Sequence, residues 1–141
     1  MAAKQVALPK NYEPSDKEEY MCSKQLEYFR QKLLKWKDDL KVESQITIDH
    51  LQRENWSEPD PNDKASLEVE TAFELRTRNR YLKLMNKIDA ALARIEDGSY
   101  GFCEETGDPI GLGRLKARPI ATLSIEAQER HERFEKNHSD D

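Results

Sequence analysis

The stretch SKQLEYFRQKLLKWKDDL, residues 23–40, decides the fold of this 141-residue chain. Its apolar residues recur at alternating steps of three and four, a spacing that places side chains along one stripe of an α-helix. They are Leu26, Phe29, Leu33, Trp36 and Leu40. Helix-forming composition continues to about Glu54, and Ser23 is a suitable N-cap. The sequence therefore predicts a first helix of roughly 32 residues, about 48 Å long.

A second long helix is predicted from about Asp63 to Glu96, where Asp97-Gly98 is a stop signal. Its apolar residues have the same heptad spacing: Tyr81, Met85, Ile88, Leu92 and Ile95. Between the helices, the Pro-rich stretch of residues 57–62 breaks the pattern. So short a connection predicts an antiparallel coiled-coil hairpin over residues 23–97. Its tip, residues 55–65, is expected to be weakly packed, because polar residues occupy the seam positions near it.

The remainder of the chain differs in kind. Residues 1–22 contain Pro9 and Pro14 and no clean period, which predicts an irregular arm that packs on the globular part. Glycines and prolines interrupt residues 99–121, as is typical of a compact ribbon of short segments. A final amphipathic helix is predicted from about Ser124 to Asn137, with Ile125 and Phe134 facing inward. The expected fold class is mainly α, with a small globular domain over residues 98–141.

Composition excludes several classes of function. The net charge of −5 leaves no basic excess to neutralise a phosphate backbone, so direct DNA binding is not expected. No apolar run approaches the roughly 20 residues that span a bilayer, and the first residues lack the pattern of a secretory signal. Cys22 and Cys103 are the only cysteines and form no disulfide framework. A cytoplasmic protein without a membrane segment is expected.

Charge is segregated along the hairpin. Residues 54–74 contain seven acidic side chains against Lys64, whereas residues 76–94 contain six basic side chains against Asp89. Helix capping alone explains Asp63, but not the whole gradient, which predicts a polarised surface. Asp60 and Asp63 are a weak signal for metal binding or acid–base catalysis, because an exposed tip has no pocket to exclude water. The chain is not expected to be an enzyme.

The ribbon segment also invites a metal interpretation, since small Gly-rich modules often need a structural staple. Its residues argue against this, because Cys103-Glu104-Glu105-Thr106 supplies one thiol where a zinc ribbon needs two. A site would have to recruit His131 or Glu104. Zinc is therefore not expected, and Cys103 is interpreted as a small buried residue.

Several ordered blocks of the sequence resemble the DksA/TraR family of bacterial RNA polymerase regulators over roughly residues 18–135. The blocks are Glu19-Tyr20-Met21, the run from Gln25-Leu26 to Trp36, Asp60-Pro61-Asn62-Asp63-Lys64-Ala65, Glu74-Leu75-Arg76-Thr77-Arg78-Asn79-Arg80, Tyr100-Gly101-Phe102-Cys103-Glu104, and Ile110-Gly111 through Leu115-Lys116-Ala117-Arg118-Pro119. The resemblance implies a hairpin that enters the secondary channel of RNA polymerase, and a globular domain that rests on the rim outside.

The resemblance also assigns roles to residues. The family's acidic tip corresponds to Asp60, Asp63 and Ala65, which would act near the polymerase catalytic centre. Basic positions for the alarmone ppGpp, or facing polymerase, correspond to Arg80, Lys83, Lys87 and Arg118. One family lysine in the last helix is Gln128 here, so a tetra-anionic ligand would lose one point charge. The family's four zinc cysteines correspond to Cys103, Thr106, Ser124 and Ala127, which implies a cysteine-poor, zinc-free type with a degenerate zinc-ribbon-like module and no resident cofactor.

The function implied is a non-catalytic regulator that binds RNA polymerase as a monomer. It would alter open-complex stability at ribosomal-RNA and amino-acid promoters, with ppGpp, in the stringent response. Two alternatives remain open at this point. A transcript-cleavage factor of the same architecture would use the tip acids to hold the second metal of polymerase. A coiled-coil adaptor would form a constitutive dimer through its apolar seam and would be indifferent to tip mutations.

Overall fold

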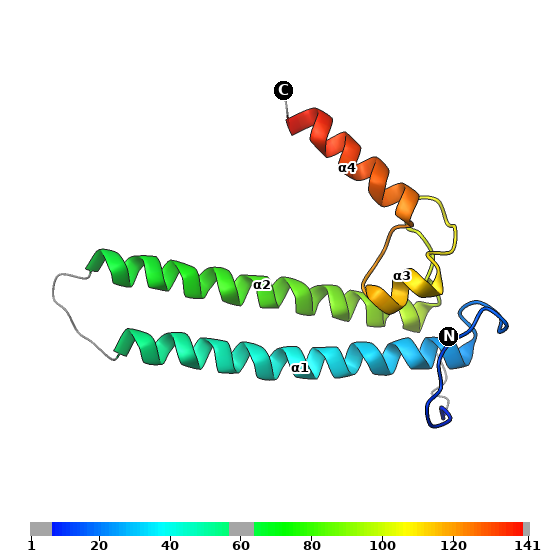
Figure 1. Cartoon of the computed structure of the whole chain (residues 1–141), viewed down its shortest axis with the longest axis horizontal. Helices are drawn as coiled ribbons and strands as arrows, with labels where there is room; N and C mark the ends of the chain where they lie inside the picture. Colours follow the sequence, from blue (N-terminus) through cyan, green and yellow to red (C-terminus); the bar gives the residue numbers. More distant parts are fainter. Residues whose placement is uncertain (1–6, 57–63, 140–141) are drawn as a thin grey trace. The chain divides into compact units, whose positions relative to one another are not determined.

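The computed structural model describes residues 7–56 and 64–139. These contain the long helices α1 (Ser23–Trp56) and α2 (Lys64–Asp97), the short helix α3 (Leu112–Ala117) and helix α4 (Ile125–Ser139) (Figure 1). The only β pairing in the described residues is an isolated antiparallel bridge between Phe102 and Pro109. The expected mainly α fold is confirmed.

The chain divides into two compact units. Leu34–Asp89 forms one of them, called here the hairpin unit. The segments before and after it form the second, called here the globular unit.

Within the hairpin unit, α1 and α2 run antiparallel (Figure 1). Three contacts fix their register. Lys37 Nζ lies 2.6 Å from Asp89 Oδ1, the hydroxyls of Thr47 and Tyr81 lie 3.4 Å apart, and Gln52 Nε2 donates to Glu74 Oε1 at 3.4 Å. Residue numbers rise on one helix as they fall on the other, as an antiparallel pair requires. The predicted coiled-coil hairpin is therefore confirmed.

Among the described residues of the hairpin unit, packing weakens along α2 toward Lys64, while the tip itself, residues 55–65, lies largely outside the residues whose burial is described. Leu40, Tyr81 and Ile88 are buried in the seam between the helices. Closer to the tip the contacts become polar, and Glu74 accepts hydrogen bonds from Arg78 and Gln52. The apolar side chains of this part of α2 are about half exposed or more: Leu67, Val69, Phe73 and Leu75. Hydrophobic burial therefore holds the base of the hairpin more strongly than its described residues nearer the tip.

The core of the globular unit is built around Tyr100, which is fully buried. Its ring lies 5.6 Å from that of Phe29, and its hydroxyl donates to the Pro119 carbonyl oxygen at 2.8 Å. Leu33, Ile95 and Leu115 complete the buried cluster. The first and last turns of the long helices thus share a core with the chain that follows Gly98.

The N-terminal arm contacts this core through Tyr20. Its hydroxyl donates to the Gly101 carbonyl oxygen at 2.7 Å and accepts the Gly111 N–H at 2.9 Å. Gly101 has a φ of 92°, and a Cβ there would lie 2.7 Å from the Met21 side chain. Glycine is therefore required at this position by both backbone conformation and space.

Two predictions for the last helix are wrong. Ile125 and Phe134, expected to face inward, are 52% and 61% exposed. Ala127 is the fully buried residue of α4, and Ile125 lies about 200° away from it around the helix, at 100° per residue. Phe134 shares the face of Ala127 but stacks on His138 instead of joining the core, with ring centroids 3.9 Å apart. Helix α3 was also not predicted, because the segment was interpreted as ribbon.

Candidate functional site

The acidic tip falls largely outside the described residues. Asp60 and Asp63 belong to the seven-residue connection between Trp56 and Lys64, of which the structure describes no residue. Ala65 lies in the first turn of α2. Their role near a polymerase catalytic centre remains a prediction.

The basic residues of α2 form an exposed stripe. Arg80, Lys83 and Lys87 follow each other at steps of three and four, which places them on one face of the helix. All three are exposed, and Arg76, one turn nearer the tip and also exposed, shares that face. We call these four residues the basic face. None of the four forms an ion pair with another described residue, so the face is free to bind an anionic partner.

Arg118 belongs to the globular unit, where its backbone is firmly held. It caps the end of α3, with its N–H donating to the Arg114 carbonyl oxygen at 2.7 Å. Lys32 Nζ donates to the Lys116 carbonyl oxygen at 2.7 Å, and Lys116 Nζ donates to the Pro14 carbonyl oxygen at 3.2 Å. These bonds join α1, the arm and α3, while the Arg118 side chain is exposed. A fixed backbone with an exposed guanidinium group is suited to binding a phosphate.

The four positions that the resemblance assigns to zinc ligands, Cys103, Thr106, Ser124 and Ala127, contact one another in the globular unit. The Ala127 N–H donates to Ser124 Oγ at 3.2 Å, so that Ser124 acts as the N-cap of α4. Burial raises the pKa of the Cys103 thiol, but hydrogen bonds from the Thr106 side chain and from the backbone at Ser124, Thr106 and Glu105 outweigh this effect and bring the pKa down to about 6. The chain therefore stabilises a thiolate at Cys103 with polar groups.

Helix α4 contacts the same loop through a second pair, the carboxylate of Glu105 and the ring of His131. Both side chains are partly exposed. In the described ranges, no three His, Cys, Asp or Glu side chains are grouped so that they could hold a metal ion. Neither His131 nor Glu104 has been recruited into such a group.

An antiparallel coiled-coil hairpin and a small globular unit built on Tyr100 define the class of protein, and comparisons with known families define it further. Residues 25–95 match the model of the DnaK suppressor protein DksA, N-terminal domain. Residues 98–133 match that of the prokaryotic dksA/traR C4-type zinc finger. The chain belongs to the DksA family.

Individual relatives agree with this assignment. The chain is 60% identical over 131 residues to the RNA polymerase-binding transcription factor DksA of Caulobacter vibrioides, covering 93% of this chain and 92% of that protein. It is 43% identical over 117 residues to the protein of the same name from Escherichia coli K12, covering 83% and 78%. Among solved structures, transcription factor DksA2 of Pseudomonas aeruginosa is 42% identical, with a TM-score of 0.74 over 83% of this chain and 90% of that one.

These matches correct the expectation about zinc. The residues predict no zinc, whereas residues 98–133 match the model of a C4-type zinc-finger family. Apart from Cys103 the single positions lack thiols, but the pattern of the whole segment is that of the zinc-finger family. The matched segment contains one cysteine, Cys103, so its residues do not fit a centre of four thiolates.

Two further expectations can be assessed. The relatives are named as transcription factors, which are non-enzymatic regulators, so the expectation that this chain is not an enzyme is confirmed. In the part of the chain that the structure describes, none of the helices has the length and apolar character needed to cross a membrane.

Proposed function

We propose that this protein is a regulator that binds RNA polymerase and acts through its secondary channel. The observation that carries the proposal is the family match over both parts of the chain, together with relatives whose names state polymerase binding. The helical hairpin supplies the shape that the proposal requires. Its α1 segment Leu34–Trp56, 23 residues long, extends about 35 Å at 1.5 Å per residue, which is enough to reach a buried site.

In this proposal the tip acts on the polymerase active centre. Asp60 and Asp63 enter the channel, and Ala65 follows them at the start of α2. A carboxylate that the channel partly desolvates interacts more strongly with nearby polymerase groups than it does in free solution. The tip thereby changes the lifetime of the open complex, with effects on ribosomal-RNA and amino-acid promoters. The protein itself contacts no DNA and works as a monomer in the cytoplasm.

The exposed cations give the proposal its second part. Arg80 and Lys83 face polymerase, while Lys87 and Arg118 contribute to a binding site for ppGpp at the interface. The exposure of these side chains and the lack of ion pairs on the basic face support this assignment. Gln128 carries no charge, and its side chain donates to Glu132 at 3.2 Å. The site accordingly has one cation fewer than the family pattern, and the protein couples the stringent response to transcription through the remaining ones.

A binding experiment tests the proposal. Fluorescently labelled protein is titrated with purified RNA polymerase core enzyme, and anisotropy reports the affinity. The proposal predicts saturable binding that a second secondary-channel ligand displaces. Binding without displacement, or no binding at all, would contradict it.

The same preparation separates the rival functions. Backtracked elongation complexes should release no new cleaved RNA when the protein is added, whereas a transcript-cleavage factor would produce it. Light scattering on the free protein distinguishes a monomer from the constitutive dimer that a coiled-coil adaptor requires.

A further inference from the structure

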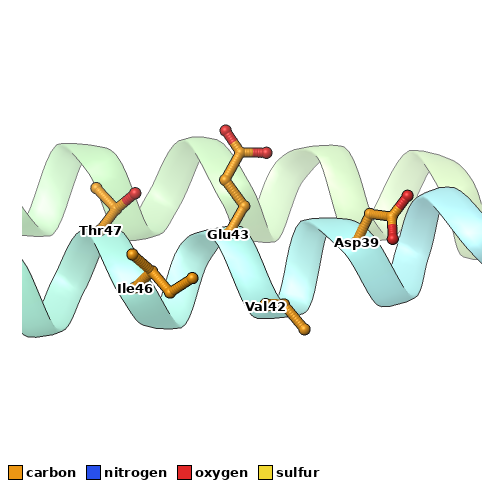
Figure 2. A pocket seen from close by; sticks show the side chains of 5 residues that line it. All are labelled: Asp39, Val42, Glu43, Ile46 and Thr47. Carbon is orange, nitrogen blue, oxygen red and sulfur yellow. The ribbon is translucent and has the colours of Figure 1, made fainter.

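A shallow groove lies on α1 within the hairpin unit, and none of the basic residues of the proposed ppGpp site lines it. It encloses about 320 Å³ and is lined by Asp39, Val42, Glu43, Ile46 and Thr47. Figure 2 shows Val42 and Ile46 on successive turns, with the carboxylates of Asp39 and Glu43 pointing to one side of this aliphatic pair. Val42 is 61% exposed and Ile46 is 64% exposed. The groove thus combines an apolar floor with two acidic groups.

Folding of the hairpin does not account for Val42 and Ile46. The buried seam of α1 in this unit passes through Leu40, and Val42 lies about 200° from Leu40 around the helix. Both residues are β-branched, so they lose rotamer freedom in a helix and favour helix formation less than Ala, Lys or Glu would. At exposed positions in the middle of a long helix, these two residues do not stabilise the free protein. A partner that covers them would remove their apolar surface from water, which favours binding.

The charges around the groove indicate the chemistry of that partner. Neither Asp39 nor Glu43 forms an ion pair with any other described residue. Residues 38–49 contain four acids, Asp38, Asp39, Glu43 and Asp49, against Lys41 alone. A nucleic acid or an acidic peptide would be repelled. Lys and Arg side chains are complementary, because their aliphatic stems cover apolar surface while their charged groups reach a carboxylate.

We propose that this groove docks a basic segment of RNA polymerase, whose Lys or Arg stems lie on Val42 and Ile46 and whose charged groups pair with Asp39 and Glu43. The inference rests on the proposed function and adds a second, lateral contact to it. The tip would act on the active centre, whereas the groove would set affinity and orientation along the flank of the hairpin. Electrostatic pairing of this kind speeds association and suppresses wrong registers.

Charge reversal with a matched control tests the inference. Asp39→Lys with Glu43→Lys changes both groove carboxylates, and Asp38→Lys with Asp49→Lys makes the same change of charge on exposed positions of α1 that do not line the groove. Anisotropy with purified RNA polymerase should show at least tenfold weaker binding for the groove pair and a change within threefold for the control pair. A third variant, Val42→Ala with Ile46→Ala, should also bind about tenfold more weakly. Its helix content by circular dichroism should stay at the wild-type level.

A photo-crosslinking residue at position 46 identifies what covers the groove. Irradiation of the complex should crosslink position 46 to a polymerase segment that contains Lys or Arg. Mass spectrometry locates that segment. Crosslinks to a second copy of this chain, to an acidic polymerase segment or to nothing would overturn the inference, as would equal binding of the two charge-reversal pairs. If wild-type protein fails to bind polymerase, the proposed function fails together with it. If wild type binds polymerase and the groove variants bind it equally well, this inference alone fails.

Discussion

At the scale of single residues, the hydroxyl of Tyr20 attaches the arm to the ribbon. It bonds to two backbone groups of the ribbon, at Gly101 and Gly111. Tyr20→Phe would leave both groups without this partner, which typically costs about 1–3 kcal/mol for each buried group. We expect about 2 kcal/mol lower free energy of unfolding in urea, because the site is only partly buried. The control is Tyr28→Phe, whose hydroxyl makes no hydrogen bond in the described part of the chain and should change stability by less than about 0.5 kcal/mol. Equal effects of the two variants would contradict the assignment.

Cys103 makes stability depend on pH. Its pKa in the folded chain, about 6, lies below the ordinary value of 9.0. Between these values the unfolded chain binds more protons, so stability should rise with pH from 6 to 9. The contribution is fully present above pH 9 and is lost as pH falls through 6. Urea unfolding of wild type and Cys103→Ala should therefore differ increasingly as pH rises through this window.

Thr106 provides a check on the cause of this effect. Its side chain is the largest of the groups that lower the Cys103 pKa, so Thr106→Val should flatten the dependence on pH. A difference between wild type and Cys103→Ala that does not change between pH 6 and 9 would show that the thiol is not stabilised as a thiolate.

At the scale of elements, two leucines on α1 distinguish the seam from the solvent face. Leu40 is 4% exposed and Leu34 is 37% exposed, both within the hairpin unit. Leu40→Ala removes the same atoms as Leu34→Ala but leaves a cavity, and such changes cost about 2–5 kcal/mol in buried sites. We expect about 3 kcal/mol for Leu40→Ala and less than half of that for Leu34→Ala. Thermal unfolding followed by circular dichroism measures both, and a reversed order would contradict the observed seam.

The long helices could be predicted because their heptad pattern extends over many turns. Helix α1 begins at Ser23 and ends at Trp56, within two residues of the prediction, and seam residues such as Phe29 and Ile88 are buried. The short helix α3 has six residues and contains Gly113, so it offers no period to detect. It depends on tertiary bonds, including that from Lys32 to the Lys116 carbonyl oxygen. Local sequence does not contain that information.

In the candidate site, too, some features could be predicted from local sequence and others could not. The exposure and spacing of Arg80, Lys83 and Lys87 follow from helical periodicity, and the sequence alone identifies them as one stripe. The groove at Val42 and Ile46 was missed, because two exposed aliphatic residues in an acidic stretch give no motif. Their signal was the poor fit of β-branched residues to exposed helix positions, which becomes informative only when the seam is known. The prediction that Phe134 faces inward is wrong for a related reason. Periodicity predicts which face of a helix is apolar, but not how far along the helix that face is covered.

At the scale of the whole molecule, the exposed cations should govern the response to ppGpp. Lys87→Ala or Arg118→Ala removes a charge-assisted contact to a phosphate, worth about 1.5–3 kcal/mol. In a promoter assay, we expect each variant to need an about tenfold or higher ppGpp concentration for the same enhancement. Basal activity without ppGpp should be largely kept. Lys41→Ala, an exposed lysine of α1 outside the basic face, is the matched control. Undiminished enhancement in both variants would remove these residues from the ligand site.

The lifetime of the open complex at a ribosomal-RNA promoter tests the central claim most directly. Purified RNA polymerase is bound to the promoter, a competitor is added, and decay is followed with no factor, wild type or Asp63→Asn. Asn caps a helix as well as Asp does, so this variant removes the charge while keeping the capping group. Wild type should shorten the lifetime severalfold, whereas Asp63→Asn should leave it as without factor while binding polymerase within about threefold of wild type. An unchanged lifetime with bound wild-type protein, or full activity of Asp63→Asn, would contradict the account.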